Sequence, residues 1–285
     1  MPKPFKVRLR RKTRRIFKTS VQWLKGLSRA KKQPARAVFV FGSQRSGTRL
    51  PIDVLDLSPH VTTYKEGNSQ AFNRVLLKSN AEIRELLRTS LFPIVAFKPI
   101  SDSHRAAELL EYFPQSKAIW IFRNYRDAVN SAVRKWQHGM NNLKHIASGN
   151  LAAAGWRAGG LTLEKIELVR RFYSEEMSSH TAYALMWYLR NHLFLDLHIH
   201  HRQQVCLVKY EDLVKEPCVH FSRFFRFIDC PFEEKFVRGV YNSSVGKDRF
   251  PEIPEELDRL CENLYFRLQS IYQDSLAEQR SPVGT

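Results

Sequence analysis

Short, continuously apolar runs alternate with helical patterns along most of the chain, and this alternation is the feature that most restricts its fold. Four runs are rich in β-branched and aromatic residues, as buried strands are: residues 37–42, 92–98, 118–122 and 204–210. Strands that are buried on both faces are typical of parallel sheets covered by helices. We therefore predict an α/β fold with three layers, α/β/α, around a central and mostly parallel sheet.

Helical patterns fill the intervals between these runs. They cover residues 48–57, 72–91, 104–112, 127–136 and about 163–197, and an amphipathic stretch follows residue 251. Residues 138–162 are rich in glycine and alanine and show little periodicity. We interpret the region around 138–180 as an insertion that forms a lid or shapes a substrate pocket.

Positive charge is concentrated at the N-terminus. The 285-residue chain carries a formal charge of +18, and residues 1–36 contain fourteen Lys and Arg but no Asp or Glu, which leaves +4 for the rest. We therefore separate a basic arm, residues 1–36, from a single domain, residues 37–285. The arm fits a solvated extension or an amphipathic helix on an anionic membrane surface. Nucleic acid is the least favoured partner.

The composition is that of a soluble globular protein, with 43% hydrophobic and 26% charged residues. No apolar run is long enough to cross a bilayer, and the N-terminus is too charged for a signal peptide. We therefore expect a cytoplasmic protein that associates at most peripherally with the inner face of a membrane. The four cysteines lack metal-ligand spacing, so no metal site is predicted.

The segment "FVFGSQRSGTRL", residues 39–50, has the pattern of a strand, a phosphate-binding turn and a helix. Such a turn offers backbone N–H groups and the positive end of a helix dipole to an anion. Gly47 would let the backbone approach the ligand, and Ser46 and Thr48 add hydroxyl groups. A P-loop requires lysine where Thr48 stands, and here the cation is Arg45. An ordinary glycine turn explains this segment alone equally well.

A second segment, residues 119–136, places Arg123 at the end of a predicted strand and Ser131 eight residues later in a helix. Ligands of open α/β sheets bind at the carboxyl ends of the strands. A guanidinium at that edge is suited to a bidentate phosphate contact, to which Ser131 could add a hydroxyl. The alternative is a local ion pair between Arg123 and Asp127, with Ser131 binding no ligand.

Three segments together resemble the sulfotransferases that use 3′-phosphoadenylyl sulfate (PAPS) as donor. The family's first motif holds the 5′-phosphosulfate, and here it corresponds to Arg45-Ser46-Gly47-Thr48-Arg49-Leu50. The second motif holds the 3′-phosphate, and here it corresponds to Arg123, Asn124, Asp127 and Ser131 at the family's spacing. A third element, "KYEDL", follows a core strand as Lys209-Tyr210-Glu211-Asp212-Leu213. The segments follow the family's order over residues 37–250.

The resemblance implies a P-loop-like sulfotransferase fold and PAPS as co-substrate, without a metal ion. It implies donor contacts by the whole first motif, by Arg123 and Ser131, and by Tyr210 of the third element. Residues 242–250 take the place of the family's late loop, which covers the 3′-phosphate and adenine, and Lys247 or Arg249 is the predicted contact there. This loop departs from the R-K-G sequence of the cytosolic branch.

The chain resembles the carbohydrate-modifying, Golgi-type and bacterial branches more than the cytosolic branch, which uses a histidine base in a K-T-H element. That element reads Lys98-Pro99-Ile100 here. The other branches use a glutamate after the first helix, where Glu66 stands. The resemblance thus implies Glu66 as general base and Lys98 as a cation that stabilises the sulfonate. The alternatives are that Glu66 is a solvated loop carboxylate, that Lys98 is a surface lysine, and that His104 is the base.

We therefore predict an enzyme that moves the sulfonate of PAPS to a hydroxyl group of a carbohydrate or glycolipid. A P-loop kinase for a small molecule is one alternative, although the lysine after Gly47 and a metal-binding acid are not evident in the sequence. A membrane adaptor that acts through its basic arm is another.

Overall fold

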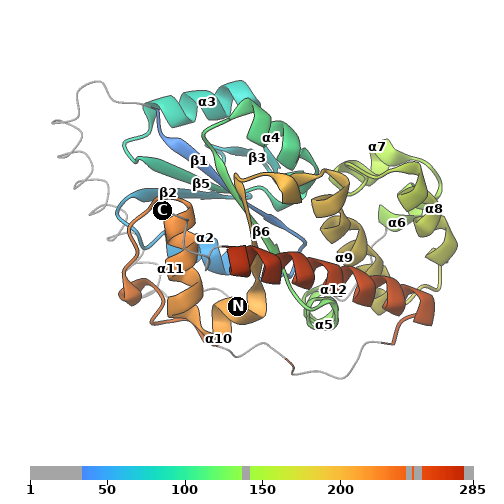
Figure 1. Ribbon diagram of the computed structural model, residues 1–285. Helices are drawn as coiled ribbons and strands as arrows, with labels where there is room; N and C mark the ends of the chain where they lie inside the picture. Colours follow the sequence, from blue (N-terminus) through green and yellow to red (C-terminus); the bar gives the residue numbers. More distant parts are fainter. Residues whose placement is uncertain (1–33, 137–141, 242–245, 247–251, 279–285) are drawn as a thin grey trace.

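The computed structural model describes residues 34–136, 142–241, 246 and 252–278. Its centre is a parallel sheet of five strands in the order β2-β5-β1-β6-β7 (Figure 1). Four of these are the strands predicted from the apolar runs: β1 (Arg36–Gly42), β5 (Ile94–Lys98), β6 (Lys117–Phe122) and β7 (Val205–Lys209). The predicted α/β class with a parallel sheet is therefore confirmed.

The fifth strand, β2 (Val61–Lys65), was not predicted. It lies at the edge of the sheet and pairs only with β5, in a register that sets Lys65 opposite Lys98. Of its five residues, Val61 alone is fully buried. An edge strand of this kind lacks the continuous apolar run by which the other four are recognised.

Helices cover both faces of the sheet, because side chains of a strand point alternately to opposite faces. On one face, Val38 and Val40 of β1 pack beneath three helices: α2 (Arg49–Leu55), α10 (Tyr210–Lys215) and α11 (Pro217–Phe227). On the other face, Phe39 and Phe41 pack beneath five: α3 (Asn80–Thr89), α4 (Ala106–Tyr112), α5 (Tyr125–Lys135), α9 (Ser179–Asp196) and α12 (Glu255–Glu278). Figure 1 shows α12 lying beside α9.

Two predicted helices differ in the structure. The helix expected at 72–91 begins with a short hairpin, β3 (Phe72–Asn73) and β4 (Leu76–Leu77), and α3 starts only after Ser79. Ser79 and Glu82 form a capping box, which fixes that start. The stretch at 163–197 is two helices, α8 (Leu163–Phe172) and α9, because the side chain of Ser178 caps a new helix.

The glycine-rich insertion folds into short elements that pack beside α9. They are α6 (Asn142–Ala147), α7 (Leu151–Ala154), η2 (Gly155–Arg157) and α8. A 3₁₀ turn, η1 (Ile100–Arg105), precedes α4, and two more lie at η3 (Ile199–His201) and η4 (Glu234–Phe236).

Most of the basic arm lies outside the described residues, which begin at 34, and Arg36 is already the first residue of β1. Of the helices that the described residues form, none has the length and apolar character to cross a bilayer.

Candidate active site

The loop between β1 and α2 is built around two residues with positive φ angles, Arg45 at 66° and Gly47 at 82°. A Cβ atom on Gly47 would lie 2.0 Å from Cδ2 of Tyr210, so the ring of Tyr210 requires glycine there. The hydroxyl oxygens of Ser43 and Ser46 lie 2.5 Å apart within the turn. The loop is thus a tight turn, and the ring of Tyr210 packs against it at Gly47.

The side chain of Arg45 reaches from this loop to α5. Its Nε and Nη2 atoms both donate to Ser131 Oγ, at 3.1 and 2.9 Å. Its guanidinium also lies 5.7 Å from the ring centroid of Trp136. Burial, together with the charges of Arg123 and Arg134, lowers the pKa of Arg45. A cluster of cations this close together is electrostatically suited to an anionic ligand.

Arg123 follows β6 and is only 5% exposed. Its Nη1 atom lies 3.4 Å from the carbonyl oxygen of Arg45, and its Nη2 atom lies 3.5 Å from Asp127 Oδ2. The guanidinium also packs 4.8 Å from the ring centroid of Tyr210. The local ion pair with Asp127 therefore exists, but the same arginine also contacts the loop, so the two predicted anion-binding segments converge.

The "KYEDL" element ties β7 to the end of β6. Glu211 Oε1 accepts a hydrogen bond of 2.9 Å from the backbone N–H of Asn124, and the Asn124 side chain caps α5. Burial raises the pKa of Glu211. No separate role was predicted for Glu211 from the sequence. Its position, one residue after Tyr210 and against the residue that follows Arg123, makes it a support of the predicted donor site.

The remaining residues of the predicted donor site differ in their placement. Ser46 is fully buried in the loop, and Thr48 is 7% exposed at the start of α2. Arg49 instead forms an exposed ion pair with Asp53, at 3.2 Å between Nε and Oδ2, and Leu50 packs against the core beneath α2. Lys247 lies outside the described residues. Gly246, its neighbour, donates from its backbone to both carboxylate oxygens of Asp127 at 3.2 Å.

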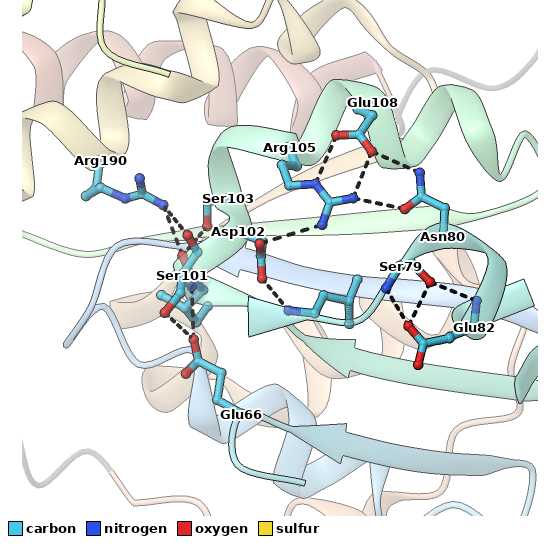
Figure 2. Close-up of polar contacts among 12 residues, drawn as sticks. Glu66, Ser79, Asn80, Glu82, Ser101, Asp102, Ser103, Arg105, Glu108 and Arg190 are labelled. Atoms are coloured by element: carbon cyan, nitrogen blue, oxygen red, sulfur yellow. Dashed lines mark hydrogen bonds and ion pairs between the residues drawn. The ribbon is translucent and has the colours of Figure 1, made fainter. Parts of the chain in front are cut away.

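Glu66 and Lys98 lie together at the carboxyl ends of β2 and β5. Lys98 Nζ donates to Glu66 Oε2 at 3.0 Å. The N–H and hydroxyl groups of Ser101 both donate to Oε1 at 2.9 Å (Figure 2). The side chain of Glu66 is 22% exposed. Three donors therefore hold one partly accessible carboxylate in a fixed orientation.

The turn η1 joins this cluster to the loop. The hydroxyl oxygen of Ser103 lies 3.4 Å from the backbone nitrogen of Gly42 and 3.3 Å from its carbonyl oxygen. Ser101 and Ser103 are thus site residues that were not predicted from the sequence. The polar sequence "SDSH" directly after strand β5 could have indicated them, because it falls at the ligand edge of the sheet.

His104 is not placed to act as the base. Burial first, and then the charges of Arg190 and Arg105, lower its pKa to about 4. Within the described structure its Nδ1 atom is buried without a hydrogen-bond partner. A Cβ atom on Gly159 would lie 2.7 Å from the imidazole, so the ring is packed against the insertion.

A polar cleft of about 860 Å³ runs along the open edge of β2. Its lining includes Lys65, Asn68 and Gln70, which lie close to Glu66 in the chain. Among the residues that the structure describes, no group of three or more His, Cys, Asp or Glu side chains is arranged to hold a metal ion.

A family model described as "Sulfotransferase domain" matches residues 35–270. No curated protein matches the sequence. The solved structure of a sulfotransferase from Alicyclobacillus acidocaldarius is similar with a TM-score of 0.52 and 14% identity, covering 85% of this chain and 97% of that one. A sulfotransferase domain from the curacin biosynthetic pathway gives a TM-score of 0.49 and 17% identity, covering 82% and 99%. A mouse sulfotransferase complexed with PAP gives 0.42 and 13%, covering 77% and 70%.

Proposed function

Because this chain belongs to the sulfotransferase family, we propose that it transfers the sulfonate of PAPS to a hydroxyl group of a carbohydrate or glycolipid. In this reaction the bond between sulfur and the 5′-phosphate oxygen breaks, and a bond forms between sulfur and the acceptor oxygen. The hydroxyl proton passes to a base, and adenosine 3′,5′-bisphosphate leaves. The contact between Arg45 and Ser131 carries the proposal, because it joins the two segments that would bind the two ends of the donor.

The chain's own groups fit such a donor. Arg45, the hydroxyl groups of Ser46 and Thr48, and the backbone at Gly47 would hold the 5′-phosphosulfate, with Arg49 and Leu50 completing that motif. Arg123 and Ser131, with Tyr210 packed against Arg123, would hold the 3′-phosphate, and Lys247 is the proposed contact from the late loop. The guanidinium groups of Arg45 and Arg123 and the three hydroxyl groups are donors of the kind that bind phosphate and sulfonate oxygens.

Glu66 is the proposed base. Each carboxylate oxygen can accept two hydrogen bonds. Ser101 supplies two donors to Oε1, whereas Oε2 receives one from Lys98 and keeps a position for the acceptor hydroxyl. Lys98 at this place would also offset negative charge on the sulfonate during transfer.

The polar cleft beside β2 supports a carbohydrate acceptor. Sugar hydroxyls are matched by amide, hydroxyl and charged side chains, and the cleft offers these at Lys65, Asn68, Gln70 and Thr63. An aromatic acceptor would need an apolar pocket of comparable size. The described pocket lined by Trp136, Tyr183 and Trp187 has a volume of only about 20 Å³.

Calorimetry with adenosine 3′,5′-bisphosphate tests the donor site. The wild-type protein should bind it, and Arg123→Ala should weaken binding by about 30-fold or more, since a buried phosphate loses a charged hydrogen-bond donor worth about 2 kcal/mol. Arg170→Ala is the matched control on α8, because Arg170 is exposed and its Nε donates to the carbonyl of Ala147. Absence of binding by the wild-type protein would refute the proposal.

Incubation with radiolabelled PAPS and a panel of glycans, glycolipids and phenols tests the acceptor. We expect label in the glycans or glycolipids, and at least about 100-fold slower labelling when Glu66→Gln replaces the wild-type protein. Label confined to phenols would contradict the carbohydrate assignment. Phosphate release from ATP with Mg²⁺, without any turnover of PAPS, would favour a kinase.

We further propose that the protein is cytoplasmic and that residues 1–36 bind the anionic inner face of a membrane, where a glycolipid acceptor would lie. The thirteen basic residues that precede Arg36 support it, since each Lys or Arg near such a surface contributes about 1 kcal/mol. Deletion of residues 1–34 should abolish binding to vesicles that contain phosphatidylserine while sulfonate transfer in solution persists. Persistent vesicle binding would remove the arm from this role.

A further inference from the structure

Arg190, on α9, is a buried cation that the donor site does not use. Its side chain is 2% exposed, and burial lowers its pKa to about 10. Within the described part of the chain, its hydrogen-bond partners are backbone carbonyls. Nη2 donates to Ile100 O at 3.1 Å and lies 3.5 Å from Ser101 O, and Nη1 lies 3.4 Å from Trp156 O. Burying a cation costs free energy. We therefore expect that the hydrogen bonds from Arg190 to these carbonyls have a specific role.

The carbonyl of Ile100 and the N–H of Ser101 belong to one peptide unit. In a trans peptide they point in opposite directions. Arg190 donates to the carbonyl end, and the N–H end donates to Glu66 Oε1 at 2.9 Å. Figure 2 shows Arg190 and Glu66 on opposite sides of this turn. A charged donor on the carbonyl polarises the peptide and strengthens its N–H as a donor, because hydrogen bonds in a chain reinforce one another.

Asp102 holds the same turn from a different direction. Its Oδ2 atom accepts from the backbone N–H of Leu77 at 2.7 Å, which ties η1 to the β3–β4 hairpin. Asp102 therefore anchors the turn to the scaffold. The Ile100 carbonyl accepts from the hydroxyl of Ser103 at 3.0 Å and from Arg190 Nη2 at 3.1 Å, and Arg190 is the charged donor of the two.

We propose that Arg190 is a positioning residue for Glu66 that acts through the Ile100–Ser101 peptide. It fixes the Ser101 N–H against Oε1 and thereby leaves Oε2, beside Lys98, directed to the acceptor. The expected loss of kcat in Arg190 variants rests on the proposed function of Glu66 as base. The structural link from Arg190 through this peptide to Glu66 does not rest on it.

Hydrogen exchange at the Ser101 amide tests the link without any assay of activity. Arg190→Met should speed exchange there by about tenfold or more, since a lost anchor permits local opening. Arg190→Lys, which keeps the charge but not the planar fork, should speed it less. Arg170→Met, an arginine on α8 whose Nε donates to Ala147 O at 2.9 Å, should leave it unchanged.

Kinetics with the acceptor found in the panel test the consequence. Arg190→Met should lower kcat by about 10- to 100-fold. The Kd for adenosine 3′,5′-bisphosphate and the KM for the acceptor should change less than about threefold. Arg190→Lys should recover part of kcat. In a Glu66→Gln background, Arg190→Lys should cost nothing further, because its effect passes through Glu66.

Unchanged exchange at Ser101 in both Arg190 variants would overturn the inference. An equal loss of kcat with and without Glu66 would also overturn it. If Arg190→Met does not fold, Arg190→Lys is used for both the exchange and the kinetic measurements. If the wild-type protein transfers no sulfonate, the proposed function fails, but the exchange measurement still decides the link between Arg190 and Glu66.

Discussion

Arg45 and Ser131, 86 residues apart in the chain, are joined by two hydrogen bonds, from Nε and Nη2 of the arginine to the one hydroxyl oxygen. The contact places the loop after β1 beside the helix after β6. A donor with two anionic ends would therefore find both predicted binding segments next to each other.

The contact predicts that Ser131→Ala weakens binding of adenosine 3′,5′-bisphosphate by about tenfold, since a hydrogen bond to a charged group contributes about 1.5 kcal/mol. Calorimetry measures the change in Kd. Ser148→Ala is the matched control, because Ser148 is exposed and its hydroxyl donates only to His145 O among the described residues. An affinity within twofold of the wild-type value would show that Ser131 does not contribute to the donor site.

The placement of Glu66 predicts that Glu66→Gln lowers kcat by about 10²- to 10⁴-fold, the usual contribution of a general base. The amide keeps an acceptor for Ser101 but cannot take up the proton. Steady-state sulfonate transfer and calorimetry are measured on the same preparation, and Kd for adenosine 3′,5′-bisphosphate should stay within twofold. Glu111→Gln, on the exposed face of α4 and outside the cleft beside β2, should leave kcat unchanged. Full turnover in Glu66→Gln would remove Glu66 from the role.

Gly47→Ala should abolish donor binding, since the new methyl group would meet the ring of Tyr210 at 2.0 Å. Gly155→Ala is the control that separates this clash from the strain of placing alanine at a positive φ. Gly155 also has a positive φ, of 60°, but no atom lies within 4 Å of the position that an added methyl group would take. Urea unfolding should show a loss of about 1–2 kcal/mol for Gly155→Ala, and more for Gly47→Ala. Equal losses in the two variants would contradict the packing role of Tyr210.

The lowered pKa of His104 predicts that the stability of the protein depends on pH. Its pKa is about 4 in the folded protein against an ordinary value of 6.5, so the unfolded chain binds a proton that the folded chain does not. The free energy of unfolding should therefore fall as the pH drops from about 6.5 to 4. His104→Gln should flatten this slope in urea titrations at pH 4.5, 5.5 and 7. Burial also lowers the pKa values of His200 and His220, so the difference between variant and wild type is the quantity to measure. An unchanged slope would contradict the assignment.

The sequence indicated the fold wherever a strand is buried on both faces. Residues 37–42 and 118–122 are continuous apolar runs because helices cover both sides of β1 and β6. At β2 only one edge pairs, and Val61 alone is fully buried, so "VTTYK" carries no comparable signal. The hairpin at 72–77 has two residues in each strand, which is too short for any period to be recognised.

The two segments that we expect to bind an anion could be singled out from the sequence because each is compact in the chain, one around Arg45 and one around Arg123, and the structure brings them into contact. The surroundings of Glu66 could not be predicted in the same way. Arg190 follows Glu66 by 124 residues and lies in a helix that is buried on nearly all sides, so no amphipathic pattern distinguishes it. Its contacts with Ile100 and Trp156 depend on how α9 packs against η1, which is a tertiary relationship.

The strand order separates the residues proposed for the acceptor from those proposed for the donor. Glu66 and Lys98 follow β2 and β5 on one side of β1, whereas Arg123 and Tyr210 follow β6 and β7 on the other. Under the proposed function, replacements near β2 during divergence from a common ancestor would alter which molecule is modified without disturbing recognition of the nucleotide. Descendants of one duplicated gene would then differ in acceptor while using the same donor.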